Sequence, residues 1–369
     1  MLFVMAGGGT GGHVVPAIAV AQELRRLGCS CLFLGTREGL ESRFVPQAGF
    51  PLEWIPAAGF QRAGLRGRAA ALALLPRALW LCLKLVRALR PAALFSMGGY
   101  VAAAPVAAAL AQRVPVVVME PNAVPGLVNR LAARWVDKAL VAFEETVRCF
   151  PPGRAEVSGV PVREAFFRIE WQPPRGAFRV LVTGGSRGAR ALNRAVRESL
   201  PFLRQTALPL EITLQAGAAE AEALDREFAS SGIRARAVAF LDDMPAAYAQ
   251  AHLVVSRAGA GAVAELAAAG VPSVLVPFPF AADDHQLRNA EAMQRAGAAV
   301  LLEERELSGR TLCETLSRLA AAPEELERMS RAARALARPG AARRAAEALI
   351  EAAGRRAGAR GSLTGNGKP

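Results

Sequence analysis

The chain has 369 residues, of which 52% are apolar, and its 34 glycines and 24 prolines show no regular spacing. This apolar fraction excludes a disordered chain, and the irregular glycines exclude a collagen-like one. At about 100–200 residues per domain, the length predicts two domains. The net charge of +13 comes almost entirely from arginine. The aromatic residues form no base-stacking series, so no nucleic-acid partner is expected.

The cysteine and histidine residues do not indicate a metal site. The five cysteines form no CxxC pair, and three histidines are too few to complete a convincing zinc site. No apolar run approaches the roughly 20 residues of a membrane-spanning helix. Residues 1–6 lack the basic start of a signal peptide, so we expect none.

Short apolar segments alternate with helical patterns along the chain, which is typical of parallel α/β domains. In the first half, strands are expected at 2–5, 31–34, 52–55, 92–95, 115–119 and 138–142. In the second half, strands are expected at 178–183, 210–214, 235–239, 252–256, 273–277 and 299–302. Residues 164–177 resemble an inter-domain linker, and the polar, glycine-rich tail from 354 is expected to be disordered.

A weak internal repeat opens the two halves. Residues 3–6 lead into the glycines at 7–9, and residues 180–183 lead into Gly184-Gly185-Ser186. Each segment has the order strand, glycine turn, helix. We therefore expect two Rossmann-like domains that bind ligand beyond the carboxyl ends of their strands.

The first glycine loop, residues 7–12, contains the GxGxxG pattern, whose glycines let the backbone approach a phosphate. A dinucleotide-binding domain would also place an acidic residue at the end of the second strand. That strand instead ends in Gly35-Thr36-Arg37, and His13 directly follows the glycines. A nucleotide- or NAD-binding module without transfer chemistry is thus a weakened alternative. His13 is either a structural residue at a helix start or a ligand contact.

A second constellation follows the strand expected at 252–256. Residues 256–264 are small apart from Arg257 and Val263, which leaves room for a phosphate or a sugar at a helix N-terminus. Glu265 is the only charged residue between Arg257 and Asp283, so we interpret it as a ligand contact rather than a surface residue. Residues 277–286 form a polar loop at the exit of the next strand, and no DxD metal motif accompanies it.

Seven motifs have the order and spacing of the MurG family, bacterial glycosyltransferases that convert lipid I into lipid II for peptidoglycan. They are GGTGGH at 8–13, MGGY at 97–100, NAVPG at 122–126, PVR at 161–163, GGS at 184–186, RAGA at 257–260 and DDHQ at 283–286. The resemblance spans residues 1 to about 350. It implies an α/β GT-B fold, with two Rossmann-like parallel-sheet domains facing across a cleft. It also implies inverting transfer from UDP-GlcNAc without a metal or other cofactor.

The resemblance further implies domain roles and partners. Residues 1–160 with about 340–353 would form an N-terminal domain for the acceptor and the membrane, and 161–339 would bind UDP-GlcNAc. The expected partners are UDP-GlcNAc, the undecaprenyl-diphosphate acceptor lipid I, an anionic membrane surface and other proteins of cell-wall synthesis or division. The expected location is the cytoplasmic face of the bacterial membrane. Another GT-B member, such as a UDP-GlcNAc epimerase or a lipid glycosyltransferase, is the nearer alternative.

Carried over residue by residue, the family's donor contacts fall on Thr10, Gly11, Gly12, Asn122, Arg163, Ser186, Leu241, Ala260, Gly261, Ala262, Val263, Ala264, Glu265 and Gln286. Glu265 would accept both ribose hydroxyls, and Ser186 would hold the diphosphate. Gln286 would bind the hydroxyls of the sugar. The C4 hydroxyl of the acceptor would attack the anomeric carbon, with His13 as the candidate general base and Glu120 as the alternative.

The chain departs from the family pattern at four positions. Met119 and Pro121 stand where the family usually has His and Gln, and Phe280 stands where a His is common. The loss of two imidazoles puts in doubt any part they have in acceptor binding or stability. Arg187 replaces a Gln and would contact the diphosphate instead.

Residues 61–90 carry seven basic residues and no acidic one. On a helix, Arg77, Trp80, Lys84 and Arg87 share one stripe. A neighbouring apolar stripe, expected to pack inward, consists of Leu72, Leu75, Leu79, Leu83 and Val86. A core helix with solvated arginines is the plain alternative. We expect the helix to lie on an anionic leaflet, because no carboxylate compensates its charge and a Trp lies on its basic face.

Overall fold

The computed structural model describes all residues except 10, 58–64, 186–187, 207, 282–283 and 365–369, and it describes the backbone alone at 65–72 and 357–364. The chain divides into two compact units, Met1–Arg163 with Gly340–Pro369, and Glu164–Pro339. The expected site residues Thr10, Ser186 and Arg187 lie outside the described residues.

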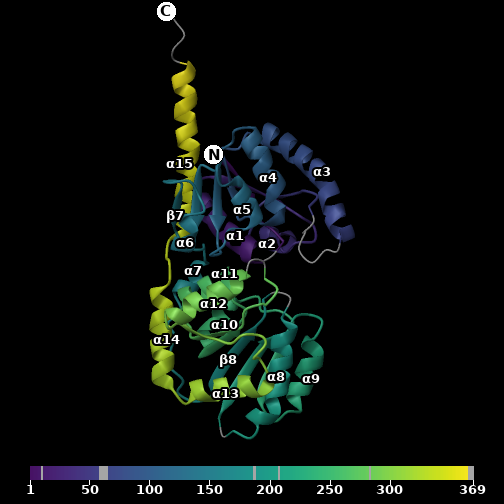
Figure 1. The fold of residues 1–369 in the computed structure, drawn as a ribbon, viewed down its shortest axis with the longest axis vertical. Helices are drawn as coiled ribbons and strands as arrows, with labels where there is room; N and C mark the ends of the chain where they lie inside the picture. Colours follow the sequence, from purple (N-terminus) through teal and green to yellow (C-terminus); the bar gives the residue numbers. More distant parts are fainter. Residues whose placement is uncertain (10, 58–64, 186–187, 207, 282–283, 365–369) are drawn as a thin grey trace, which may run out of the picture. The chain divides into compact units, whose positions relative to one another are not determined.

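The first unit is built on a seven-stranded parallel sheet with the order β3-β2-β1-β4-β5-β6-β7. Its strands are β1 (Leu2–Ala6), β2 (Ser30–Gly35), β3 (Leu52–Trp54), β4 (Ala93–Ser96), β5 (Val116–Glu120), β6 (Lys138–Val141) and β7 (Ala155–Val157). Its helices are α1 (Gly11–Arg26), α2 (Glu41–Gln47), α3 (Leu65–Leu89), α4 (Gly99–Ala111), α5 (Leu127–Ala132), α6 (Glu144–Val147) and α15 (Ala341–Thr364) (Figure 1). The six strands expected from the sequence are confirmed to within a residue. The short, partly exposed β7 was missed because it contains no apolar run.

The second unit repeats this plan with a six-stranded parallel sheet in the order β10-β9-β8-β11-β12-β13. Its strands are β8 (Phe178–Thr183), β9 (Leu210–Gln215), β10 (Arg234–Val238), β11 (Leu253–Ser256), β12 (Ser273–Leu275) and β13 (Ala299–Leu301). Its helices are α7 (Glu164–Phe167), α8 (Arg190–Leu203), α9 (Ala221–Ala229), α10 (Met244–Gln250), α11 (Ala260–Ala269), α12 (His285–Arg295), α13 (Gly309–Ala320) and α14 (Pro323–Ala335). All six strands match their predictions to within two residues.

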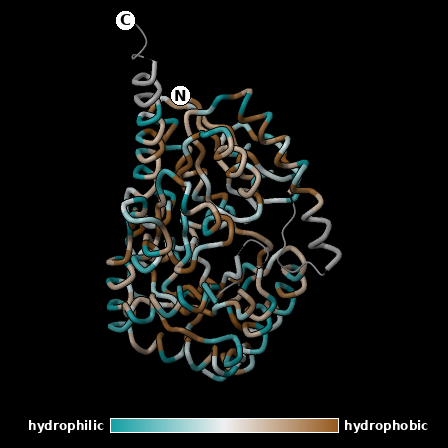
Figure 2. Tube along the Cα trace, turned by 45° about the horizontal axis from the view of Figure 1, so that its top comes forward, coloured by the Kyte–Doolittle hydropathy of each residue, from teal (hydrophilic) through white to brown (hydrophobic). Residues whose placement is uncertain are grey.

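The central strands explain why these segments form parallel sheets. Every residue of β4, β5 and β11 is buried, as expected where helices cover both faces of a sheet. The outer helices are mixed in character, and hydrophobic and hydrophilic turns alternate along them in Figure 2. In each unit the strand order reverses once, between β1 and β4 and between β8 and β11. Such a reversal leaves a crevice at the carboxyl ends of the two strands, where open α/β sheets bind their ligands.

Helix α3 packs on α4, and its predicted inward stripe is confirmed in part, since Val86 is buried and Leu79 and Leu83 pack against the core. Ala78, Cys82 and Val86 are the fully buried residues, whereas Leu79 and Leu83 are only partly buried. Small residues let the helix approach α4 closely, so the large leucines lie at the sides of the contact. Within the described residues, no helix has the length and apolar character needed to cross a bilayer.

Two connecting segments contain helix that the sequence did not indicate, although the boundary between the units does fall at the start of the expected linker. The linker expected at 164–177 begins with α7, whose Phe166 is fully buried and meets the Tyr248 ring edge-on, with ring centroids 5.3 Å apart. The tail expected to be disordered from 354 continues α15 to Thr364. Alanine and arginine favour helix strongly enough to offset the isolated glycines, each of which costs about 1 kcal/mol. The remaining tail, 365–369, lies outside the described residues.

Helix α15 returns the chain to the first unit, where it packs on α1 and contacts β4, β5 and β6 of the sheet. Its contact face is made of small residues, with Ala345, Ala346 and Ala348 fully buried together with Leu349. Arg344 anchors it through an ion pair of 2.5 Å with Glu156 of the neighbouring β7 segment.

Candidate active site

Three loops meet the carboxyl edge of the first sheet next to its strand-order reversal. They follow β1, β4 and β5 and include residues 7–9, 97–98 and 121–126. Parallel pairing of β1 with β4 and of β4 with β5 brings the ends of these strands together. The three loops contain the glycine-rich motifs identified in the sequence, so tertiary structure gathers motifs that lie more than 100 residues apart.

Glu41 holds the first glycine loop in place. Its Oε2 accepts a hydrogen bond of 2.7 Å from the Gly9 backbone N–H, and its Oε1 accepts bonds of 2.8 Å from the N–H and the hydroxyl of Thr36. The side chain is fully buried. A buried carboxylate without hydrogen bonds would be costly, so these three bonds fix both the loop and the end of β2.

The ring of His13 lies against the backbone of the second glycine motif. A Cβ atom at Gly99 would stand 3.2 Å from His13 Cε1 and 3.3 Å from Nδ1, and Gly99 has a φ of +75°. A Cβ atom at Gly9, where φ is +82°, would stand 2.9 Å from the Tyr100 ring. Glycine at both positions therefore allows His13 and the second motif to approach the first loop. His13 stays partly accessible, as a proton acceptor in a reaction must.

Glu120 is deeply buried, with 2% exposure, and it organises the third loop. Its Oε1 accepts from the backbone N–H and the Nδ2 of Asn122, at 3.0 and 3.2 Å. Its Oε2 accepts from the Gly126 N–H at 2.9 Å and from Asn129 Nδ2 at 3.0 Å. Burial raises the pKa of this carboxyl, although the hydrogen bonds oppose the shift. Both oxygens are thus already engaged within the chain.

The second unit presents a tight glycine turn after β8. A Cβ atom at Gly184 would stand 2.3 Å from the Ala189 nitrogen, and one at Gly188 would stand 2.0 Å from the Ala216 carbonyl oxygen. Gln215, at the end of β9, donates to the Gly185 carbonyl oxygen at 2.8 Å and accepts from the Leu241 N–H at 3.3 Å. One buried amide therefore joins the turn to Leu241, one of the expected donor contacts.

Helix α11 begins directly after β11, the strand that lies across the strand-order reversal from β8. Its first residues are Ala260 to Ala264, and Gly259 precedes it as the cap. Glu265 lies on the second turn and is partly exposed. Arg257 joins the loop before the helix to its neighbours, donating to the carbonyl oxygens of Val276 and Pro277 at 3.2 Å and pairing with Glu304 at 2.5 Å.

The loop after β12 holds Gln286 in a defined orientation. Its side-chain oxygen accepts a hydrogen bond of 3.0 Å from the Phe278 N–H, which leaves the amide nitrogen as the group that can donate to a ligand. Asn289, one turn later, is buried and donates to the Ala258 carbonyl oxygen at 3.0 Å. Phe280 is 82% exposed and meets the Phe278 ring edge-on.

The expected site residues thus fall into two groups. The first unit brings together Gly11, Gly12, His13, Glu120 and Asn122, and Arg163 is its last residue before α7. In the second unit, Ala260 to Glu265 form the start of α11 after β11, and Gln286 lies in α12 after β12. Leu241 follows β10 and is joined to the end of β9 through Gln215. The four residues expected to contact the membrane lie on the exposed side of α3: Arg77, Trp80, Lys84 and Arg87. The Lys84 ammonium stands 3.8 Å from the centroid of the Trp80 ring.

Several supporting residues were not found by sequence reasoning. Glu41, Asn129 and Gln215 are buried polar side chains that hold the motif loops through hydrogen bonds to backbone groups. Glu41 lies 32 residues from Gly9, Asn129 lies 10 from Met119, and Gln215 lies 30 from Gly185. A single sequence therefore carries no spacing signal for them.

Comparison with known proteins agrees with this arrangement. Residues 3–141 match the model of the glycosyltransferase family 28 N-terminal domain, and residues 179–346 match that of the C-terminal domain. A UDP-N-acetylglucosamine--N-acetylmuramyl-(pentapeptide) pyrophosphoryl-undecaprenol N-acetylglucosamine transferase of Solibacter usitatus is 52% identical over 95% of this chain and 96% of its own. A relative of the same name from Nitrosococcus oceani is 44% identical over 95% of this chain and 98% of its own.

Solved structures show the same likeness. The crystal structure of Acinetobacter baumannii MurG has a TM-score of 0.75 and 30% identity, covering 95% of this chain and 99% of that one. The UDP-GlcNAc 2-epimerase of Neisseria meningitidis, with a TM-score of 0.65 and 13% identity over 95% of this chain and 99% of that one, shares the fold alone. The predicted GT-B class, with two parallel-sheet α/β domains, is confirmed. The chain belongs to the MurG family, within glycosyltransferase family 28.

Proposed function

We propose that the chain transfers GlcNAc from UDP-GlcNAc to the C4 hydroxyl of the MurNAc-pentapeptide of lipid I, with inversion at the anomeric carbon, and so forms lipid II. The observation that carries the proposal is the pair of glycine-rich turns, one in each unit, beside the strand-order reversals. We infer the donor and the acceptor from the name shared by two relatives that are 44% and 52% identical to this chain.

In this proposal the second unit binds the donor. The N–H groups at the start of α11 and the turn after β8 would face the diphosphate, whose charge is favoured at a helix N-terminus. Glu265 would accept the ribose hydroxyls, and Gln286 would donate to the sugar. Negative charge that develops on the departing UDP would be stabilised by backbone N–H groups and by Arg163.

The first unit would bind the acceptor and take up its proton. The C4 oxygen would attack the anomeric carbon from the face opposite UDP, the bond to UDP would break, and the hydroxyl proton would pass to His13. We propose His13 rather than Glu120 as the base. Both carboxylate oxygens of Glu120 already accept hydrogen bonds within the first unit, from Asn122, Gly126 and Asn129. Glu120 would instead position Asn122.

The activity is tested with radiolabelled UDP-GlcNAc and a short-chain lipid I analogue. Equal amounts of UDP and β-linked product should form only when the acceptor is present. Consumption of UDP-GlcNAc without acceptor, or formation of an epimer, would assign the chain to another GT-B activity. An α-linked product would contradict inversion.

We also propose that α3 attaches the protein to the cytoplasmic face of the membrane. Its exposed stripe combines Arg77, Lys84 and Arg87 with Trp80, whose side chain is 56% exposed. Each basic side chain near an anionic leaflet contributes about 1 kcal/mol.

Conversion of the three basic residues to Gln should lower co-sedimentation with anionic vesicles and remove its salt dependence. Conversion of Arg226, Arg305 and Arg331, three exposed arginines of the second unit, is the charge-matched control. Equal losses in both variants would contradict attachment through α3.

A further inference from the structure

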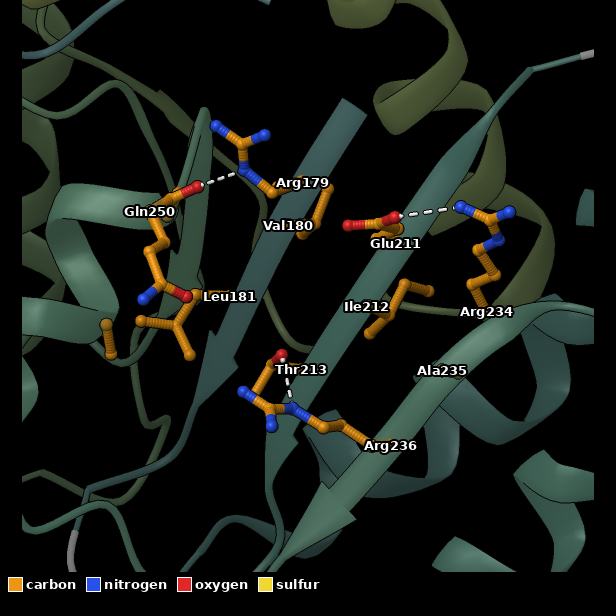
Figure 3. A pocket seen from close by; sticks show the side chains of 12 residues that line it. Arg179, Val180, Leu181, Glu211, Ile212, Thr213, Arg234, Ala235, Arg236 and Gln250 are labelled. Carbon is orange, nitrogen blue, oxygen red and sulfur yellow. Dashed lines mark hydrogen bonds and ion pairs between the residues drawn. The ribbon is translucent and has the colours of Figure 1, made fainter. Parts of the chain in front are cut away.

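The second sheet has an open, basic face at the amino-terminal ends of β8, β9 and β10 (Figure 3). Strand pairing places Arg179, Glu211 and Arg234 in one row across the three strands. The next row consists of Leu181, Thr213 and Arg236. These rows line a shallow cavity of about 350 Å³, which the last turn of α10 borders through Gln250.

The face carries three guanidinium groups against one carboxylate. The guanidinium of Arg179 has two partners, since its Nε donates to the Gln250 carbonyl oxygen at 2.5 Å and its Nη2 lies 2.9 Å from His252 Nε2. Arg236 Nε donates to Thr213 Oγ1 at 3.1 Å. Arg234 pairs with Glu211 at 3.2 Å. A guanidinium has five N–H donors, so these contacts use only part of its capacity. The arginines are oriented and still able to bind a further anion.

Exposure distinguishes this face from the interior of the sheet. The side chain of Arg234 is 81% exposed, and Arg236 is exposed as well. On the opposite face of β9, Leu210, Ile212 and Leu214 are buried in the core. Helices normally cover both faces of a parallel sheet, and Leu181 of β8 is buried in this way. Arg234 and Arg236 of the edge strand β10 remain exposed, so a binding partner can reach them.

The geometry points to one kind of occupant, and we propose that this face binds an extended, acidic segment of a partner protein. Arg234 and Arg236 are alternate residues of one strand, and alternate residues of any extended chain lie about 7 Å apart. Carboxylates at alternate positions of such a segment would match the two arginines, each through a forked pair of hydrogen bonds. A small ligand fits less well, because small-molecule sites enclose most of the ligand surface.

The surface is separate from the proposed donor site. Two residues further along the same strands lie Thr183 and Gln215, the latter holding the glycine turn after β8. The hydrogen bonds of Arg179, Arg234 and Arg236 in the described part of the chain go to Gln250, His252, Glu211 and Thr213, none of which is proposed to bind UDP-GlcNAc. Loss of the arginines should therefore leave the basal transfer reaction unchanged.

The test uses the full chain and a fluorescent twelve-residue peptide in which Glu alternates with Thr. Its affinity, measured by anisotropy at 50 and 150 mM salt, should fall at least tenfold in Arg234→Gln/Arg236→Gln. The control Arg305→Gln/Arg331→Gln removes two exposed arginines of the same unit, each of which pairs with a carboxylate as Arg234 does, and it should change affinity less than twofold. A peptide of equal composition with its Glu residues in one block should bind more weakly.

Four results would overturn the proposal. They are no binding at 50 mM salt, equal losses in the two double variants, equal affinity for the alternating and block peptides, and displacement of the peptide by inorganic phosphate at an equal concentration of charge. The last result would assign the face to small anions instead. Thermal unfolding of both variants at the temperature of the parent would show that the comparison concerns binding and not folding.

Discussion

The carboxylate of Glu41 accepts a hydrogen bond of 2.7 Å from the backbone N–H of Gly9 and so holds the first glycine loop from behind. The same side chain fills the space that a Cβ atom at Gly8 would need, with Glu41 Oε1 only 2.5 Å from that position. The shape of the loop thus depends on a buried acid in α2, a helix that contains none of the recognised motifs.

Glu41→Gln should impair catalysis more than folding. The amide oxygen can still accept on one side, but the NH₂ group on the other side would face an N–H donor. Either Gly9 or Thr36 therefore loses the acceptor of its backbone N–H. Loss of one such buried bond costs about 1–3 kcal/mol. We expect kcat to fall at least tenfold, while a folded chain persists in circular dichroism. Glu38→Gln changes an exposed neighbour and should have no effect. An unchanged kcat in Glu41→Gln would show that the loop keeps its shape without the carboxylate.

His13→Ala tests the proposed base. The lost interaction belongs to the transition state, so kcat should fall by about 10²–10⁴-fold while the affinity for UDP-GlcNAc stays within about threefold. Glu120→Gln, by contrast, should loosen the loop that holds Asn122 and change stability together with turnover. Turnover and donor affinity are measured separately, by product formation and by calorimetry. Near-normal turnover of His13→Ala from pH 6 to 9 would make His13 structural and return Glu120 as the candidate.

Glu265→Ala should weaken donor binding with little effect on folding, because the side chain is partly exposed on α11. A charge-assisted contact to the ribose is worth on the order of 1.5–3 kcal/mol, which corresponds to roughly a 10- to 150-fold loss of affinity. Calorimetric titration with UDP measures this directly. Glu314→Ala, at an exposed position of α13, serves as the matched control. Equal UDP affinities in the two variants would remove Glu265 from the donor site.

His252 should make the second unit less stable in mild acid. Burial and the neighbouring Arg179 lower the pKa of its imidazole to about 4, and its Nδ1 accepts the Arg179 backbone N–H at 3.0 Å. An unfolded chain has a histidine pKa near about 6.5, so it binds the proton more tightly than the folded chain does. The stability contributed by neutral His252 is therefore complete above pH 6.5 and is lost as the pH falls toward 4.

The loss should amount to about 1–3 kcal/mol over this range. Urea unfolding of the parent and of His252→Gln, followed by tryptophan fluorescence from pH 7.5 to 4.5, measures the difference. Trp171 reports on the site because its indole N–H donates to the His252 carbonyl oxygen at 3.1 Å. The variant should be less stable at neutral pH but should lose less stability on acidification. Parallel curves for both proteins would show that His252 does not control the pH dependence.

Local sequence determined the strands, the glycine turns and the family of this protein. Short segments rich in apolar residues marked 12 of the 13 strands in the described part of the chain. Central strands such as β4, β5 and β11 are buried on both faces and need apolar side chains throughout, whereas β9 and β10 alternate with polar residues. Glycine motifs marked the loops at the strand ends, since only glycine accepts the positive φ angles at Gly9 and Gly99 without strain. The short β7 and the end of α15 were not determined in this way, because neither has an apolar period of its own.

Tertiary structure alone decided which residues support the loops and which face of each element stays open. Glu41 reaches Gly9 across 32 residues, and Gln215 reaches Gly185 across 30. A hydrogen bond between positions so distant leaves no periodic trace in one sequence. The basic sheet face is a further example, since Arg179 and Arg234 lie 55 residues apart and share a row only because β8 and β10 both pair with β9. Strand order and register, which depend on the packing of the whole unit, bring these charges together.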